Sequence, residues 1–231
     1  MVFIKNYIRS VKKKRNSGFS LVELIVAFAI LAVVALCISI MMGAGSNMFA
    51  RVNKNINLSF RTQIPVSQLR EYIVDSVGVA QEKDESGNVT TYLTGYDGDV
   101  LKIYCITWVD TDNDEINDTV KMKSADVVTE HSVDYSQTDL TWSDEQVFAK
   151  KVTDFKLELN NAVTSMKIYF KSTVKSNGKD SSYEKNILVN FRNSVVYADK
   201  NKMLDNSDFT GVNDLGRYLA HITAKNERGE L

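Results

Sequence analysis

Acidic residues at two places in this sequence could do chemistry. One is a single carboxylate, Glu23, inside an apolar run from Phe19 to Met42. The other is the stretch from Asp110 to Asp118, in which carboxylates alternate with other residues. A carboxylate within a membrane-spanning segment costs about 2.5–3.5 kcal/mol on insertion scales, so it is usually functional and has a partner. Alternating carboxylates could instead provide oxygen ligands for a hard cation such as Ca²⁺.

A cationic partner for Glu23 could come from a cut in the chain. Gly18 lies at the border between the basic leader Lys12–Arg15 and the apolar run. Cleavage between Gly18 and Phe19 would free the amine of Phe19, four residues before Glu23. We expect this amine to be the group that pairs with the carboxylate.

The segment from Gly18 to Glu23, GFSLVE, after its short basic leader resembles the class III signal of type IV pilins and type II secretion pseudopilins. The resemblance implies that prepilin peptidase cuts after Gly18 and methylates Phe19. It also implies that Glu23 acts in assembly with other pilin or pseudopilin subunits. The stretch Ile187–Asn193 resembles the last-strand pattern of J-type minor pseudopilins and their pilus counterparts, and the length of 231 residues also favours a minor subunit.

An ordinary secretory signal or a plain membrane anchor is the alternative interpretation of this N-terminus. An ordinary signal has an apolar region of about 7–15 residues followed by a small-residue cleavage site. Phe19–Met42 contains 24 residues, and a helix of that length spans about 36 Å, more than the ~30 Å hydrocarbon core. Neither alternative explains Glu23 or Gly18.

The distribution of charge predicts the orientation in the membrane. The first 18 residues contain six basic residues and no acid, so their removal takes the formal net charge from −1 to −7. By the positive-inside rule, the N-terminus stays cytoplasmic and the globular part lies outside, held by the lipid bilayer until assembly at the cell surface. An acidic mature chain gives no electrostatic indication of DNA binding.

The apolar pattern predicts one long N-terminal helix. Residues 1–18 form the cleaved leader, 19–42 the transmembrane and filament-core helix, and 43–80 its amphipathic continuation, ending near Gly78. Apolar residues recur every three or four positions, as on one face of a helix. These are Phe49, Val52, Ile56, Phe60 and Ile64, then Leu69, Tyr72, Ile73 and Val77. The intervening residues, Thr62 among them, form the expected polar face, and Pro65 is expected to kink or break the helix.

Residues 81–198 are expected to form an antiparallel β domain. Runs rich in β-branched and aromatic residues alternate with polar turns. They are Val89–Leu93, Val100–Val109, Thr119–Lys123, Val147–Leu159, Val163–Val174 and Tyr183–Tyr197. Ser176–Lys179 is the expected hairpin turn. Residues 199–231 are expected to be a polar C-terminal tail, with a possible short helix at Leu215–Ile222. The resulting fold class is α+β: a long helix packed on an antiparallel sheet, as in pilins.

The acidic stretch has two interpretations. As a calcium loop, Asp110, Asp112, Asp114 and Asp118 would occupy positions 1, 3, 5 and 9. The EF-hand pattern fails, because its required Gly at position 6 and Glu at position 12 are replaced by Glu115 and Lys121. A solvated hairpin loop is the alternative, since Asp and Asn are typical turn residues.

The sequence contains no recognisable catalytic motif, so we expect a structural subunit rather than an enzyme. The interpretation is a minor pilin or pseudopilin of a type IV pilus (fimbria) or type II secretion-like filament. Two alternatives remain. The first is a single-span, membrane-anchored extracellular binding module, and the second is a DNA-uptake (competence) or adhesion subunit at a filament tip.

Overall fold

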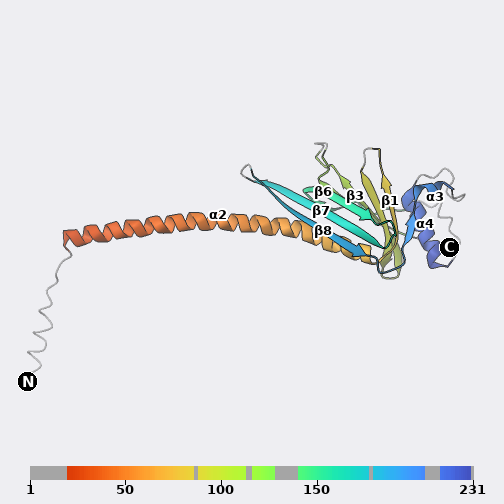
Figure 1. Cartoon of the computed structure of the whole chain (residues 1–231), viewed down its shortest axis with the longest axis horizontal. Helices are drawn as coiled ribbons and strands as arrows, with labels where there is room; N and C mark the ends of the chain where they lie inside the picture. Colours follow the sequence, from red (N-terminus) through yellow and green to blue (C-terminus); the bar gives the residue numbers. More distant parts are fainter. Residues whose placement is uncertain are drawn as a thin grey trace, which may run out of the picture. The chain divides into compact units, whose positions relative to one another are not determined.

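A computed structural model describes residues 20–85, 88–112, 116–127, 140–176, 179–205 and 214–229. The chain divides into two compact units, one up to Asn53 and one from Lys54 onward. The leader, Gly18 and Phe19 lie outside the described residues. An apolar helix and a β domain make up the described part, which confirms the α+β fold class (Figure 1).

Helix α2 (Leu21–Val74) is formed by the apolar run and its continuation. Within the first unit, every described residue up to Asn53 is exposed, although most of those before Gly43 are apolar. Aliphatic side chains dominate this part of the helix, which is long and apolar enough to cross a membrane. No described residue of the chain therefore covers its apolar surface.

The second unit begins inside α2, and its domain buries the face of the helix that carries Leu58, Thr62, Val66, Leu69 and Ile73. Between residues 54 and 64 the domain covers the face of the helix that was expected to be polar and exposed. Thr62, expected on the polar face, is 0% exposed.

The residues expected on the buried side remain uncovered instead. Ile56 is 46%, Phe60 56% and Ile64 55% exposed. The helix has two apolar stripes about half a turn apart, and periodicity alone does not show which one the domain covers.

Pro65 does not break α2, contrary to expectation. The helix continues to Val74, and Pro65 is itself buried against the domain. Packing of an apolar helix face outweighs the loss of one backbone hydrogen bond at proline. The helix ends before Gly78, because the chain turns at Asp75 and Ser76 and starts a strand. At this turn the Ser76 hydroxyl donates to the carbonyl of Tyr72 at 2.6 Å.

Two sheets form the β domain. Sheet A contains β1 (Ser76–Lys83), β2 (Val89–Asp97), β3 (Val100–Val109), β4 (Thr119–Asp126), β5 (Gln146–Lys150) and β9 (Val196–Ala198), in the order β5-β4-β3-β2-β1-β9. Sheet B contains β6 (Val152–Leu159), β7 (Ser165–Ser176) and β8 (Lys179–Asn190). The described pairs are antiparallel except β1 with β9, which is parallel.

One expected helix assignment and two expected strand assignments need correction. Residues 76–80 were expected to be helical and belong to β1. The run Val147–Leu159 splits at Lys151, whose φ of 59° turns the chain from β5 in sheet A to β6 in sheet B. The run Tyr183–Tyr197 splits into β8 and β9. The expected hairpin is present, because Ser176 pairs with Lys179.

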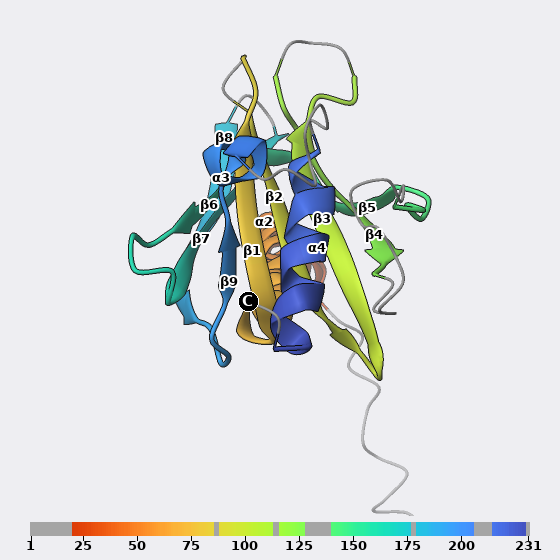
Figure 2. The same ribbon diagram turned by 90° about the vertical axis from the view of Figure 1, so that its right-hand side faces the viewer.

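Sheet A is covered on both faces. One core lies between its first face and helix α4 (Leu215–Glu227), and it includes Ala80, Ile103 and Leu219. The other core lies between its second face, α2 and sheet B, and it includes Leu69, Ile106 and Phe170. Figure 2 shows α4 in front of β1–β3 with α2 behind them. Burial on both faces explains why β3 reads as nearly continuous apolar sequence.

The C-terminal segment is not a polar tail, but the short helix expected at Leu215–Ile222 is present as the first part of α4. Helix α3 (Lys200–Asp205) buries Met203, and α4 buries nine residues, from Leu215 to Ala224, against sheet A. Asp214 caps α4, since its side chain accepts a hydrogen bond from the backbone N–H of Arg217 at 3.0 Å. Small and polar residues form a large part of the buried face of α4. Because few of them are large and apolar, the sequence did not predict that this helix belongs to the core.

Gly78 is the position where this packing tolerates no side chain. A Cβ there would clash with the Thr94 hydroxyl of β2 and lie 2.6 Å from the Thr223 hydroxyl of α4, whereas at Gly95 the nearest atom, the Asp75 carbonyl oxygen, would be 3.5 Å away. We expect Gly78→Ala to lower the free energy of unfolding by about 1–3 kcal/mol through overpacking. The matched variant Gly95→Ala should change it by less than about 0.5 kcal/mol. Chemical unfolding followed by tryptophan fluorescence checks both, and equal stability of the two variants would contradict this packing.

Candidate functional site

The candidate site is the beginning of α2, where Ser20 and Glu23 bind each other's backbone. The Ser20 N–H donates to Glu23 Oε2 at 3.0 Å, and the Glu23 N–H donates to Ser20 Oγ at 3.2 Å. The Ser20 carbonyl also accepts from the Leu24 N–H at 3.1 Å. These reciprocal bonds form a capping box, with Ser20 at the N-cap and Glu23 three residues later.

The capping box fixes the position of the Glu23 carboxylate. Oε2 is engaged by the Ser20 N–H, while Oε1 has no hydrogen-bond partner among the described residues. The N-terminal end of a helix carries partial positive charge, which favours a carboxylate in the first turn. One carboxylate oxygen is thus held within the chain, and the other remains available to a donor outside it.

Ser20 is the residue that the sequence analysis missed. The signal was present: a Ser three residues before a Glu, directly ahead of an apolar run, is the sequence pattern of a capping box. Gly18 and Phe19 lie outside the described residues, so the cleavage site between them and the methylation of Phe19 stay predictions.

The opposite end of α2 is held by the residues that follow β8. The Arg192 N–H donates to the Val74 carbonyl at 2.9 Å. Arg192 Nη1 lies 2.8 Å from Asp75 Oδ1, and Asn193 Nδ2 donates to the Asp75 carbonyl at 3.4 Å. The last carbonyls of a helix lack intrahelical donors. The Arg-Asn pair that ends the Ile187–Asn193 pattern therefore provides the donors that terminate α2.

The acidic stretch is brought together only in part. Asp118 Oδ1 accepts from the hydroxyls of Thr111 and Thr119, both at 2.8 Å, and these hydrogen bonds lower the pKa of Asp118. Asp110 Oδ1 accepts from the Asp112 N–H at 3.0 Å. Such bonds are typical of a turn between two strands, here β3 and β4.

Calcium binding by the acidic stretch stays a prediction. Asp114 lies outside the described residues. Among the residues that the structure does describe, no group of three or more His, Cys, Asp or Glu side chains is arranged to hold a metal ion.

Comparison with known proteins identifies the N-terminal motif. Residues 13–36 match the prokaryotic N-terminal methylation motif, a range that includes Gly18, Phe19, Ser20 and Glu23. No curated protein and no solved structure matches the chain. The chain thus carries the type IV pilin-like motif at the start of its long apolar helix.

Proposed function

We propose that this protein is a structural, minor subunit of a type IV pilus or type II secretion-like filament. Prepilin peptidase cuts it between Gly18 and Phe19 and methylates Phe19. One observation carries the proposal: the methylation motif at residues 13–36 coincides with the start of α2, whose first part is covered by no described residue of the chain. A motif of this type implies processing of the chain and assembly with other pilins.

The uncovered part of α2 requires an apolar environment before and after assembly. Residues 21–42 suit a lipid bilayer by length and composition. Helices of other subunits offer the same residues an equally apolar environment, so transfer into a filament need not expose them to water. The positive leader supports an orientation with the N-terminus inside the cell and the β domain outside.

The uncovered stripe of α2 supports assembly rather than simple anchoring. Ile56, Phe60 and Ile64 lie on the face of the helix opposite Leu58 and Thr62, which the domain buries. A plain anchor would need no apolar side chains there, on a helix face that belongs to the water-exposed domain. We assign this stripe to contact with neighbouring subunits.

Glu23 has a defined role in this proposal. Oε2 remains in the capping box, and Oε1 receives the methylated amine of Phe19 from a neighbouring subunit. A buried ion pair is better suited to specifying register than to adding stability. The pair would therefore set the axial position of one subunit relative to the next.

The minor-subunit assignment rests on the length of the chain and on one stretch of its sequence. The chain has 231 residues, and its Ile187–Asn193 stretch resembles the pattern in J-type subunits. Arg192 and Asn193 give this stretch a structural role at the end of α2.

Variants at Glu23 separate helix capping from charge pairing. Glu23→Gln retains a side-chain acceptor for the Ser20 N–H but removes the charge, whereas Glu23→Val removes both. We expect both variants to insert and to be cleaved normally, and both to be recovered in sheared filaments at a level at least tenfold below the wild type. Immunoblots of membrane and filament fractions measure this. Wild-type recovery of Glu23→Gln would contradict charge pairing.

A charge on the uncovered stripe should block assembly without unfolding the domain. Phe60→Asp places a carboxylate where we expect a neighbouring subunit, and burial of an unpaired charge is strongly unfavourable. Because Phe60 is 56% exposed in the single chain, its replacement should change domain stability by less than about 0.5 kcal/mol. Filament recovery should fall severalfold. The control is Leu204→Asp on α3, where Leu204 is 59% exposed, and equal recovery of the two variants would overturn the assignment.

A further inference from the structure

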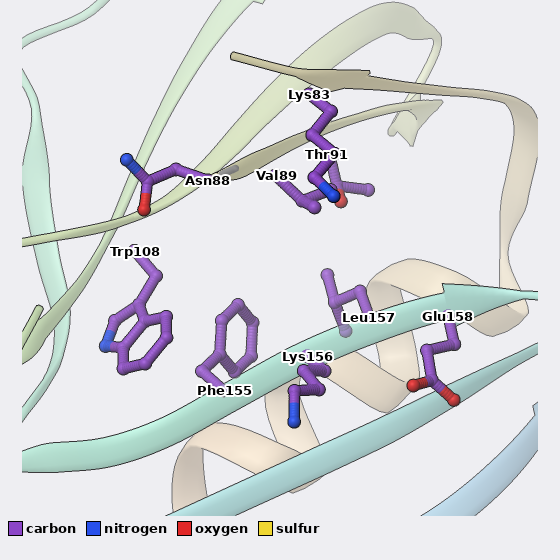
Figure 3. A pocket seen from close by; sticks show the side chains of 9 residues that line it. All are labelled: Lys83, Asn88, Val89, Thr91, Trp108, Phe155, Lys156, Leu157 and Glu158. Atoms are coloured by element: carbon purple, nitrogen blue, oxygen red, sulfur yellow. The ribbon is translucent and has the colours of Figure 1, made fainter. Parts of the chain in front are cut away.

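A cleft lies between the two sheets of the β domain. Its volume is about 310 Å³, and Lys83, Val89 and Thr91 of sheet A lie across from Phe155 and Leu157 of sheet B, with Trp108 at one side (Figure 3). We call this space the inter-sheet cleft. Pockets for small ligands range from about 300 to 1,000 Å³, so the inter-sheet cleft suits a small molecule.

The body of the inter-sheet cleft is apolar and partly aromatic. Phe155 and Leu157 are each 7% exposed and belong to the core between the sheets. Figure 3 shows the Trp108 indole beside the Phe155 ring. Aromatic walls of this kind favour a ligand with a flat ring, which gains offset or edge contacts in addition to burial.

Gln81 of β1 links the two sheets beside the inter-sheet cleft. Its Nε2 donates to the Thr91 hydroxyl at 3.1 Å and to the Leu157 carbonyl of sheet B at 2.8 Å. The inter-sheet cleft is therefore present before a ligand arrives, which lowers the entropic cost of binding.

The charges around the inter-sheet cleft are asymmetric. Lys156 Nζ lies 3.4 Å from Asp154 Oδ1, and Glu158 Oε2 lies 3.9 Å from Lys167 Nζ. Figure 3 shows the charged ends of Lys156 and Glu158 directed away from the inter-sheet cleft, whereas Lys83 extends into the space opposite Leu157. Lys83 is an exposed residue that pairs through its backbone with Val89, and its ammonium has no ion-pair or hydrogen-bond partner among the described residues.

The polar groups that lack partners here are donors. Besides the Lys83 ammonium, the buried Trp108 Nε1 has no acceptor among the described residues. A carboxylate attached to an apolar ring complements this arrangement: the ring would contact the apolar and aromatic side chains, and the carboxylate would contact the ammonium. The second contact is a charge-assisted hydrogen bond, which is stronger than a neutral one.

We propose that the inter-sheet cleft binds a small aromatic carboxylic acid, with its ring against Trp108, Phe155 and Leu157 and its carboxylate at Lys83. Such binding would give the extracellular domain a ligand-binding function in addition to the assembly role of α2. The inference does not depend on filament assembly, since every residue that carries it lies in the β domain.

Tryptophan fluorescence of the full-length protein in lipid nanodiscs tests the proposal. The chain has two tryptophans, so a Trp142→Phe background leaves Trp108 as the single reporter. The probes are 3-phenylpropionate and its neutral analogue 3-phenylpropanol, with empty nanodiscs subtracted. The variants are Lys83→Gln, Lys83→Arg and a control lysine outside the inter-sheet cleft, Lys150→Gln.

The proposal expects a saturable change in Trp108 emission with 3-phenylpropionate and at least fivefold weaker binding of the alcohol. Lys83→Gln should weaken binding of the acid three- to tenfold, Lys83→Arg should restore most of it, and Lys150→Gln should leave it unchanged. The titration extends to about 10 mM 3-phenylpropionate, so that it would detect even weak binding with a Kd of about 1 mM. Absence of a saturable change over this range would overturn the proposal. Equal binding of acid and alcohol, or unaltered binding in Lys83→Gln, would also overturn it.

Discussion

Helix α2 presents more apolar surface than its own domain covers, and the rest of the structure depends on this imbalance. From Lys54 onward one face of the helix is buried, and Leu69 and Ile73 are fully inaccessible within the core between the sheets. The opposite face keeps Ile56, Phe60 and Ile64 exposed. Up to Asn53 the described residues are exposed throughout. Burial of apolar surface is favourable by about 25 cal/mol per Å². This surface therefore needs a cover, which a bilayer or other subunits would provide.

The β domain holds the last turns of α2 through packing and hydrogen bonds. Sheet A receives α2 and sheet B on one face and α4 on the other, so the domain has two cores and no disulfide among the described residues. Arg192 and Asn193 donate to the carbonyls at the end of the helix. At the other end of α2, Ser20 and Glu23 begin the helix with a capping box that leaves one carboxylate oxygen available. The start of the helix is thus specified by a local capping box, and its end by polar contacts with residues far away in the sequence.

The sequence predicted those features that depend on local pattern. The motif around Gly18, the long helix, the α+β class and the β7–β8 hairpin all follow from charge, periodicity or turn residues. It did not predict which stripe of α2 the domain covers, because Phe60 and Leu58 are equally apolar. The break between β5 and β6 at Lys151 was not predicted, because a single backbone angle is not visible in the sequence pattern. The burial of α4 was not predicted either, because it depends on packing against strands that are distant in the sequence. The capping box was readable from Ser20 and Glu23 and was overlooked.

The central claim is that this chain is a processed pilin-like subunit, and the mass of its N-terminal peptide tests that claim most directly. Protein isolated from its native membrane and digested with a protease should yield a peptide that begins at Phe19 and carries one additional methyl group, 14 Da. The same peptide should be absent when Gly18 is replaced by a bulky residue. A peptide that begins at Met1 would contradict the account, and so would one that begins after Ala44, where small residues follow the apolar run as at the cleavage site of an ordinary secretory signal.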